Sequence, residues 1–294
     1  MERAKGILYA ALSSSTFGLA PLFTLLLLGL GYSSFEVLSY RWGVASLFLG
    51  ALALLAGRSF RLSWPELRTV FFLSLFRAAT SLSLVIAYQH IASGVASTIH
   101  FMYPLAVALA MMCFFREKGS VWVFAAIGVS IVGAVLLSLG NVDFTRGNTT
   151  LGMVSAAVSV VSYGGYIVGV RKSRAVGIDS TVLTCYVMGL GALYFIAGGL
   201  VTGGIRIETD GTAWLCILGV ALPATAVSNM TLVQAIKRIG PTLTSVFGAL
   251  EPVTALFFGV AVFGEPFTVQ GAAGILLIVA AVTIVILHSG RRKA

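Results

Sequence analysis

Charged residues are scarce in this sequence of 294 residues, which has 19 basic residues, 10 acidic residues and 58% hydrophobic residues. An average soluble domain is about 25% charged, whereas this chain is 10% charged. So few charges cannot cover the surface of a soluble protein of this size, which excludes a water-soluble enzyme or nucleic-acid-binding domain. The net charge of +9 does not change this, because the basic residues are spaced between apolar stretches and form no patch.

Residues for metal, disulfide and catalytic chemistry are also few. The chain has three cysteines, each in a separate apolar stretch, and three histidines that do not cluster with acids or cysteines. This distribution argues against a disulfide framework or a metal site. The sequence contains no G-x-S-x-G, no H-E-x-x-H and no ATP-binding loop. We therefore expect no enzyme activity, no metal, no cofactor and no direct use of ATP.

Apolar stretches that are long enough to cross a bilayer fill most of the chain. A transmembrane helix needs about 20 apolar residues. Ten such stretches follow one another with short connections, at 6–30, 35–57, 67–87, 94–115, 121–139, 151–170, 180–203, 212–235, 240–263 and 269–288. The first is too long for a signal peptide. The sequence therefore predicts an all-α integral membrane protein with ten transmembrane helices.

Basic residues fall mainly on one side of the predicted membrane. Fifteen of the 19 lysines and arginines lie at span ends on the side of the N-terminus, whereas only Arg146 and Arg206 lie in loops on the other side. Cytoplasmic loops carry an excess of lysine and arginine. We therefore place both termini in the cytoplasm and expect a multi-pass protein of a bacterial inner membrane.

The two halves of the chain, 1–145 and 146–294, resemble each other. One pattern recurs 146 residues later, where Gly6, Ala10, Ala11, Ser13, Phe17 and Gly18 match Gly152, Ala156, Ala157, Ser159, Tyr163 and Gly164. A second recurs 148 residues later, where Ser97, Pro104, Phe115 and Glu117 match Ser245, Pro252, Phe263 and Glu265. Because each half holds five predicted spans, the second half enters the membrane from the opposite side. Such inverted repeats are typical of alternating-access carriers.

Several motifs carry a resemblance to a known family. In the second half they are Ala235–Gly240, Leu250-Glu251-Pro252, Gly264-Glu265 and Gln270-Gly271-Ala272, and in the first half they are Ser13–Gly18, Arg41-Trp42, Tyr103-Pro104 and Glu117. With these motifs the chain resembles the EamA family of the drug/metabolite transporter superfamily. The resemblance implies two inverted five-helix repeats, in which spans 1, 3, 4, 6, 8 and 9 surround a central cavity and spans 5 and 10 are peripheral. It also implies export of small metabolites, amino acids or drugs.

Ionisable residues inside a bilayer are costly and are candidates for function. Arg77 lies near the middle of its span and shares a helix face with Ser81 and Tyr88. It either holds a substrate carboxylate through forked hydrogen bonds or forms a structural ion pair with Glu251. Glu251 is the one carboxylate deep within a span, where it either carries a proton for antiport or satisfies backbone groups freed beside Pro252.

Arg41 lies only one to two turns from the end of its span. We expect it to snorkel toward the membrane surface or to form a structural pair. The resemblance implies an arginine at this position across the family, which also favours a structural role. For this reason Arg41 is not among the cavity candidates.

Aromatic and hydroxyl side chains provide further candidates for the cavity. His100 and Tyr103 are neighbours at i and i+3, and the imidazole either binds substrate or bonds a neighbouring helix. An aromatic stripe on the sixth span either contacts an amphipathic solute or packs helices together, and it is similar to that of the family's aromatic amino-acid exporters. These candidates are Phe17, His100, Tyr103, Tyr163, Tyr166, Thr225 and Asn229.

Small residues and prolines predict how the helices pack and bend. Gly165 and Gly169 form a small-xxx-small pair that favours close helix approach. Proline kinks a helix interior, so four prolines inside predicted spans are hinge candidates: Pro21, Pro104, Pro223 and Pro252.

These observations favour an alternating-access carrier that exports amino acids, including aromatic ones, and related small metabolites. The alternative is a multidrug or other metabolite exporter with proton antiport, in which Glu251 attracts a cationic drug. An intramembrane enzyme lacks a supporting motif, and a channel would need a wet, repeated polar lining. Because the symmetry is complete within one chain, we expect a monomer whose partners are a small-molecule substrate and the lipid bilayer, with no nucleic acid.

Overall fold

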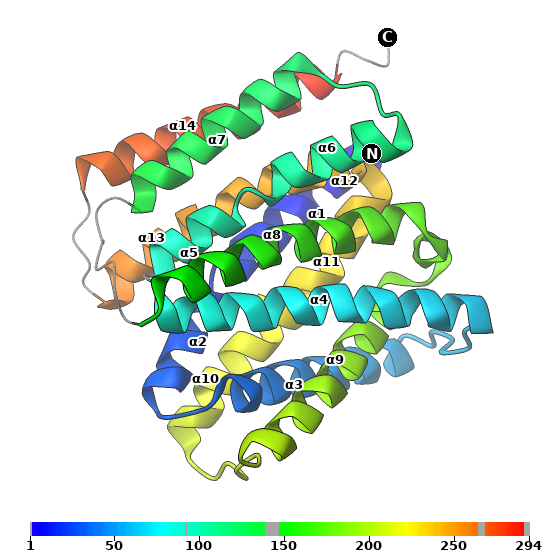
Figure 1. Ribbon diagram of the computed structural model, residues 1–294. Helices are drawn as coiled ribbons and strands as arrows, with labels where there is room; N and C mark the ends of the chain where they lie inside the picture. The colour runs from blue at the N-terminus through cyan, green and yellow to red at the C-terminus, as the bar shows by residue number, and fades with distance from the viewer. Residues whose placement is uncertain (1, 92, 139–146, 264–267, 291–294) are drawn as a thin grey trace.

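The computed structural model describes residues 2–91, 93–138, 147–263 and 268–290 of the chain (Figure 1). Within these ranges the regular elements are all helices, as the sequence predicted. A few residues used in the sequence analysis lie outside the described residues: Arg146, Gly264, Glu265, Arg291, Arg292 and Lys293.

The first half of the chain forms seven helices in the described ranges. They are α1 (Glu2–Phe17), α2 (Ala20–Gly29), α3 (Ser34–Leu55), α4 (Trp64–His90), α5 (Ser93–His100), α6 (Tyr103–Phe115) and α7 (Val121–Ser138). A capping box sets the start of α3. The Ser33 hydroxyl accepts a hydrogen bond from the backbone N–H of Glu36, and the Glu36 carboxylate accepts one from the backbone N–H of Ser33.

The second half contains more interrupted helices. They are α8 (Thr149–Lys172), the 3-10 helix η1 (Arg174–Gly177), α9 (Ser180–Thr202), α10 (Gly211–Ala221), the π-helix η2 (Leu222–Val227), α11 (Ser228–Ile239), α12 (Pro241–Val246), the 3-10 helix η3 (Phe247–Ala249), α13 (Leu250–Phe263) and α14 (Val269–Gly290). Asp179 and Asp210 cap the first turns of α9 and α10 through their carboxylates.

Seven helical segments of the described chain are long and apolar enough to cross a membrane, compared with the ten that we expected. Two shorter apolar helices, Val121–Leu136 and Val269–Ile284, add to them. The predicted span 240–263 is divided among α12, η3 and α13, so it is not one continuous helix. The described part of the chain is therefore all-helical, with several helices able to cross a membrane, and the count of ten spans stays a prediction.

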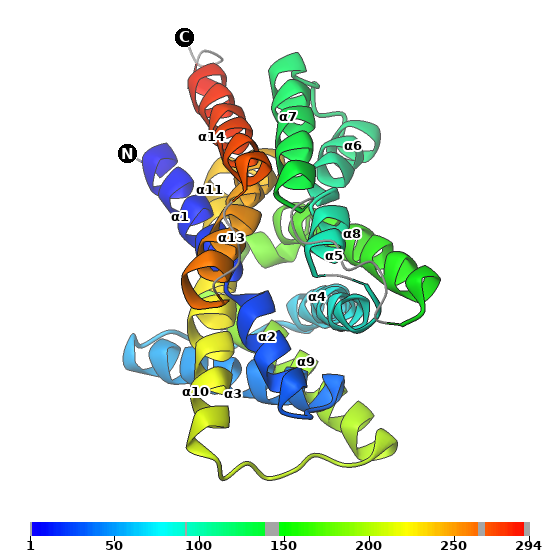
Figure 2. The same cartoon turned by 90° about the vertical axis from the view of Figure 1, so that its left-hand side faces the viewer.

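Helices of the two halves pack against one another in pairs. α3 packs along α9, α4 along α8, α1 along α11 and α7 along α14, with the last pair at one edge of the molecule (Figures 1 and 2). The close approach predicted for α8 is confirmed, because a Cβ atom at Gly169 would lie 2.7 Å from Leu73 Cδ2 of α4. The start of α1 and the end of α14 lie toward the same side of the molecule in both views.

Each span that contains a hinge candidate is interrupted near its proline. Pro21 and Pro104 lie in the first turns of α2 and α6, just after the breaks that separate these helices from α1 and α5. Pro223 lies within η2, and Pro252 lies in the first turn of α13 after η3. Proline donates no backbone hydrogen bond, so it is tolerated at a helix start and disturbs the ladder elsewhere. The role of these interruptions as hinges stays a prediction.

Candidate functional site

Arg77 is the centre of a polar and aromatic cluster in the interior of the molecule. Only 1% of its surface is exposed, although it carries a charge. Its Nε donates to Asn229 Oδ1 on α11 at 2.8 Å, and its Nη1 donates to Ser81 Oγ at 3.4 Å. Its guanidinium carbon lies 5.1 Å to 6.0 Å from four ring centroids, those of Tyr163, Phe17, Trp42 and Tyr166. Residues far apart in the sequence are thus brought together from α1, α3, α4, α8 and α11.

Arg41 belongs to the same cluster. Of the two roles expected for it, snorkelling to the membrane surface was wrong, whereas a structural pair agrees with its hydrogen bond inside the protein. It is buried on α3, with 4% of its surface exposed. Its Nε donates to Thr225 Oγ1 on η2 at 2.6 Å, and its guanidinium carbon lies 5.8 Å from the Phe17 ring centroid. The side chain is held inside because a hydroxyl on η2 accepts its hydrogen bond in the protein interior. We call Arg41, Arg77 and the side chains that they contact the arginine cluster.

The arginine cluster has no paired carboxylate in the part of the chain that the structure describes. The salt bridges found there join Glu2 to Lys5 and Arg238, Asp179 to Arg58, and Glu36 to Arg206. Arg77 and Glu251 therefore do not form the structural ion pair that we considered. A guanidinium stays protonated in proteins, so both buried arginines keep a charge, and neither forms a salt bridge with a described acid.

Glu251 approaches the arginine cluster through two tyrosines. Tyr103 Oη donates to Glu251 Oε1 at 3.2 Å. The ring centroids of Tyr103 and Tyr163 lie 4.6 Å apart, and Tyr163 also contacts Arg77. Gly248 makes room for this arrangement, because a Cβ atom there would overlap the Tyr103 hydroxyl. Glu251 thus lies beside Tyr103 and Arg77 lies beside Tyr163, so residues of opposite charge contact the two rings of one aromatic pair.

His100 and Tyr88 differ in how closely they join this site. The His100 ring packs against Tyr103 and Tyr163, with centroid distances of 5.3 Å and 5.2 Å. Its Nδ1 shares a hydrogen bond with Ser159 Oγ on α8 at 2.8 Å, so it does bond a neighbouring helix. Tyr88 instead lies in a separate apolar cluster, and its Oη is 3.5 Å from Ser97 Oγ.

The sequence analysis missed Arg41 and Trp42 as members of the site. Both were visible as part of the Arg41-Trp42 motif, but position along the span pointed to a structural role. In the described structure several buried polar atoms near Arg77 or beside its aromatic neighbours have no hydrogen-bond partner: Arg41 Nη2, Trp42 Nε1, His100 Nε2 and Tyr166 Oη. Buried polar groups without a partner are uncommon in proteins, so this concentration of them distinguishes the region around Arg77.

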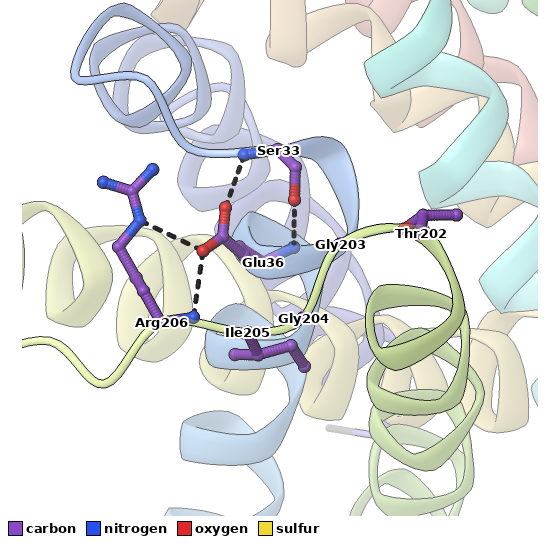
Figure 3. A pocket seen from close by; sticks show the side chains of 7 residues that line it. All are labelled: Ser33, Glu36, Thr202, Gly203, Gly204, Ile205 and Arg206. Atoms are coloured by element: carbon purple, nitrogen blue, oxygen red, sulfur yellow. Dashed lines mark hydrogen bonds and ion pairs between the residues drawn. The ribbon is translucent and has the colours of Figure 1, made fainter.

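Two cavities are found elsewhere on the described protein. An apolar groove of about 690 Å³ runs along α4 and α8, lined by Phe72, Leu75, Phe76, Ala79, Val154, Ala157, Val158, Val161 and Ser162. A smaller cavity of about 340 Å³ lies between the start of α3 and the segment after α9 (Figure 3). Neither is lined by the arginine cluster, where the side chains pack against one another.

The smaller cavity is lined by an arginine that forms a salt bridge and that the sequence analysis did not single out as a site residue. Glu36 Oε1 accepts hydrogen bonds from the backbone N and the Nε of Arg206, at 3.1 Å and 3.0 Å (Figure 3). Arg206 also lies 4.1 Å from the Tyr32 ring centroid and donates to the Gly31 carbonyl. We call the Glu36–Arg206 pair the loop clamp. Its sequence signal was the Ser33-x-x-Glu36 capping pattern, which places Glu36 at a helix start.

Comparison with known proteins agrees with this architecture. Over its full length the chain superposes on a solved crystal structure with a TM-score of 0.79, covering 100% of this chain and 99% of that chain, at 21% identity. That similarity concerns the fold. A Bacillus subtilis protein named uncharacterized transporter YojE is 26% identical over 91% of this chain and 88% of its own length. An uncharacterized transporter of Archaeoglobus fulgidus is 25% identical over 81% of this chain and 83% of its own length.

The model of the EamA-like transporter family matches residues 4–139 and 150–287, which is most of the chain. The relatives are named as transporters without a substrate, so they do not support the narrower similarity to aromatic amino-acid exporters. The family and these names point to a transporter and not to an enzyme. With its apolar helices and these matches, the chain belongs to the EamA-like transporter family of multi-pass membrane proteins.

Proposed function

We propose that this protein is an alternating-access carrier that exports amino acids, including aromatic ones, and related small metabolites. The observation that supports this most strongly is the buried guanidinium of Arg77, which has aromatic rings around it and no described acid paired with it. An unpaired buried charge is costly. A substrate carboxylate would accept hydrogen bonds from Arg77 and remove that cost during transport.

The rest of the interior suits the other parts of an amino acid. Glu251 supplies a carboxylate for an ammonium group, and the rings of Phe17 and Tyr163 offer apolar surface to a side chain. Asn229 Nδ2 donates to the Thr225 carbonyl, which holds its Oδ1 toward Arg77 and orients the guanidinium. The site therefore combines both charges of a zwitterion with an aromatic wall.

The proposed topology is ten spans arranged as two inverted repeats, 1–145 and 146–294, with both termini in the cytoplasm of a bacterial cell. The helix pairs support it. In the proposed repeat, α1 corresponds to α8, α3 to α9, α4 to α10–α11 and α7 to α14. The α4–α8 pair therefore corresponds to the pair of α10–α11 with α1, and the pairs α3–α9 and α7–α14 each join a helix to its own counterpart. Such a repeat lets the two halves rock about a central site. One chain contains the whole arrangement, so we expect it to function as a monomer.

A reconstitution experiment tests this function. The purified protein is reconstituted into liposomes that are loaded with an amino-acid mixture. Efflux of the amino acids is then followed with and without a pH gradient. We expect saturable and selective efflux of amino acids that empty liposomes do not show. If folded protein releases no amino acid under either condition, the proposed substrate class is wrong.

A multidrug exporter with proton antiport is the second candidate, favoured by one observation. The Glu251 carboxylate has a hydrogen bond from Tyr103 but no salt bridge among the described residues, so it can receive a cation. The same vesicles decide between the two functions. Uptake of a cationic dye that depends on a proton gradient and is lost in Glu251→Gln would favour the drug exporter over the amino-acid carrier.

A further inference from the structure

The charge balance of the arginine cluster points to the net charge of the substrate. Arg41 and Arg77 are both buried, and both guanidiniums lie within 6 Å of the centroid of the same ring, that of Phe17. Glu251 is the one described carboxylate nearby, through Tyr103 and Tyr163. Since guanidiniums do not lose their protons, the cluster is one positive charge in excess even when Glu251 is ionised.

The unsatisfied hydrogen-bonding groups point to the same conclusion. Arg41 Nη2 and Trp42 Nε1, from consecutive residues of α3, are buried without a hydrogen-bond partner in the described structure. Both are donors that cannot accept a hydrogen bond. The Trp42 and Tyr166 rings both lie within 6.0 Å of the Arg77 guanidinium carbon, so these groups belong to the same site. A site rich in unused donors is suited to a ligand rich in acceptors.

Aromatic rings strengthen this preference for an anion. Phe17, Trp42, Tyr163 and Tyr166 surround Arg77 and exclude water from it. Charges interact more strongly in such a low-dielectric environment than in water. A ligand without net charge would leave one guanidinium uncompensated, whereas a ligand with a net charge of −1 would neutralise the site.

We propose that Arg41 and Arg77 form a two-guanidinium anion subsite, and that the transported molecule is an amino-acid-like metabolite with one more carboxylate than ammonium groups. This rests on the proposed function and narrows its substrate class. Two kinds of molecule meet the requirement. One is an acidic amino acid, and the other is an amino acid whose amino group is acylated. Arg77, which Asn229 orients, holds one carboxylate, while Arg41 and Trp42 donate to further oxygen atoms of the anion.

Pairs of ligands that differ by one charge test the proposal. Binding to the purified protein is measured for L-glutamate against L-glutamine, L-aspartate against L-asparagine, and N-acetyl-L-phenylalanine against L-phenylalanine. We expect the more anionic member of each pair to bind about tenfold more tightly or better. If the neutral members bind equally well or better, or if no member binds, the proposal is wrong.

Substitutions of Arg41 test whether this residue causes the preference for the more anionic ligand. Arg41→Gln should remove most of the difference within each pair, whereas Arg68→Gln, which changes an exposed arginine on α4, should keep it. Should Arg41→Gln fail to fold, Arg41→Lys provides the second variant. It keeps the charge but lacks the forked geometry, so it should retain the preference for anions with weaker binding. A preference unchanged in Arg41→Gln, or binding of the anions as tight in Arg41→Lys as in the parent protein, would overturn the role of Arg41.

Flux measurements separate failure of this proposal from failure of the proposed function. If neutral amino acids leave the liposomes and their anionic counterparts do not, the carrier function stands and the anion subsite is wrong. If the anionic members bind more tightly but no amino acid or acylated amino acid crosses the membrane, the subsite stands and the proposed export function is wrong.

Discussion

Arg206 and Arg77 show two ways in which this protein treats a guanidinium. Arg206, whose side chain is 42% exposed, binds Glu36 twice and stacks on Tyr32. Arg77 is 1% exposed and has an amide, a hydroxyl and aromatic rings around it, but no paired acid in the described structure. If pairing served stability alone, the buried arginine would need it more. The difference supports the proposal that the loop clamp stabilises the fold, whereas the unpaired charges of the arginine cluster serve to bind an anionic ligand.

Arg77→Gln should reduce transport most strongly. The glutamine keeps a polar group beside Asn229 but removes the charge that holds the substrate. Loss of a buried charged partner costs about 2–5 kcal/mol, so efflux below saturation should fall by about 30-fold or more. The thermal unfolding midpoint should stay the same or rise, because an unpaired buried charge is removed. Efflux and thermal unfolding are measured on the same preparation.

Arg68→Gln serves as the matched control, since it removes an exposed charge from the same helix. It should leave both efflux and the unfolding midpoint close to those of the parent protein. A marked loss of stability in Arg77→Gln with efflux retained would show that Arg77 is structural.

Gly248→Ala tests the connection between Tyr103 and Glu251 and should have an intermediate effect. The new methyl group would overlap the Tyr103 hydroxyl, so the ring must move away from Glu251. Overpacking of a buried site costs about 1–3 kcal/mol, and we expect efflux to fall about tenfold together with the unfolding midpoint. Gly43→Ala on α3 is the control, because a Cβ atom there contacts nothing within 4 Å. Normal stability and efflux in Gly248→Ala would contradict this account.

Glu36→Gln should lower the stability of the protein slightly and leave transport unchanged. It weakens both hydrogen bonds from Arg206 and the capping box at the start of α3. The pair is partly exposed, so the loss should be about 1 kcal/mol, seen as a small fall in the unfolding midpoint with ligand affinity unchanged. Arg206→Gln should have a similar effect, and the double variant should be little worse than either single variant. Altered ligand affinity with unchanged stability would place the loop clamp in the transport machinery.

Much of the membrane architecture follows from the sequence because it depends on local composition. The backbone hydrogen-bonding groups of a long apolar stretch in a bilayer must be paired within the segment, which an α-helix achieves. Prolines inside a helix remove one of these hydrogen bonds and kink or interrupt it. The candidates Arg77 and Glu251 also follow from the sequence, because a charge within an apolar stretch is unusual by itself. Pro252 marked span 240–263 as one that bends, whereas the 3-10 turn η3 at Phe247–Ala249 was not predicted from the sequence.

Which charges are paired was decided only by the tertiary structure. Position along the helix left open whether Arg41 reaches the membrane surface or forms a structural pair, and the structure shows that Thr225, 184 residues away, accepts its hydrogen bond in the interior. Glu36 and Arg206 are 170 residues apart and meet because α3 and α9 pack together. Sequence composition determined that this is a helical membrane protein with few buried charges. Long-range packing determined which of those charges form a salt bridge and which have none among the described residues, because charge pairing depends on distances of a few ångströms between distant segments.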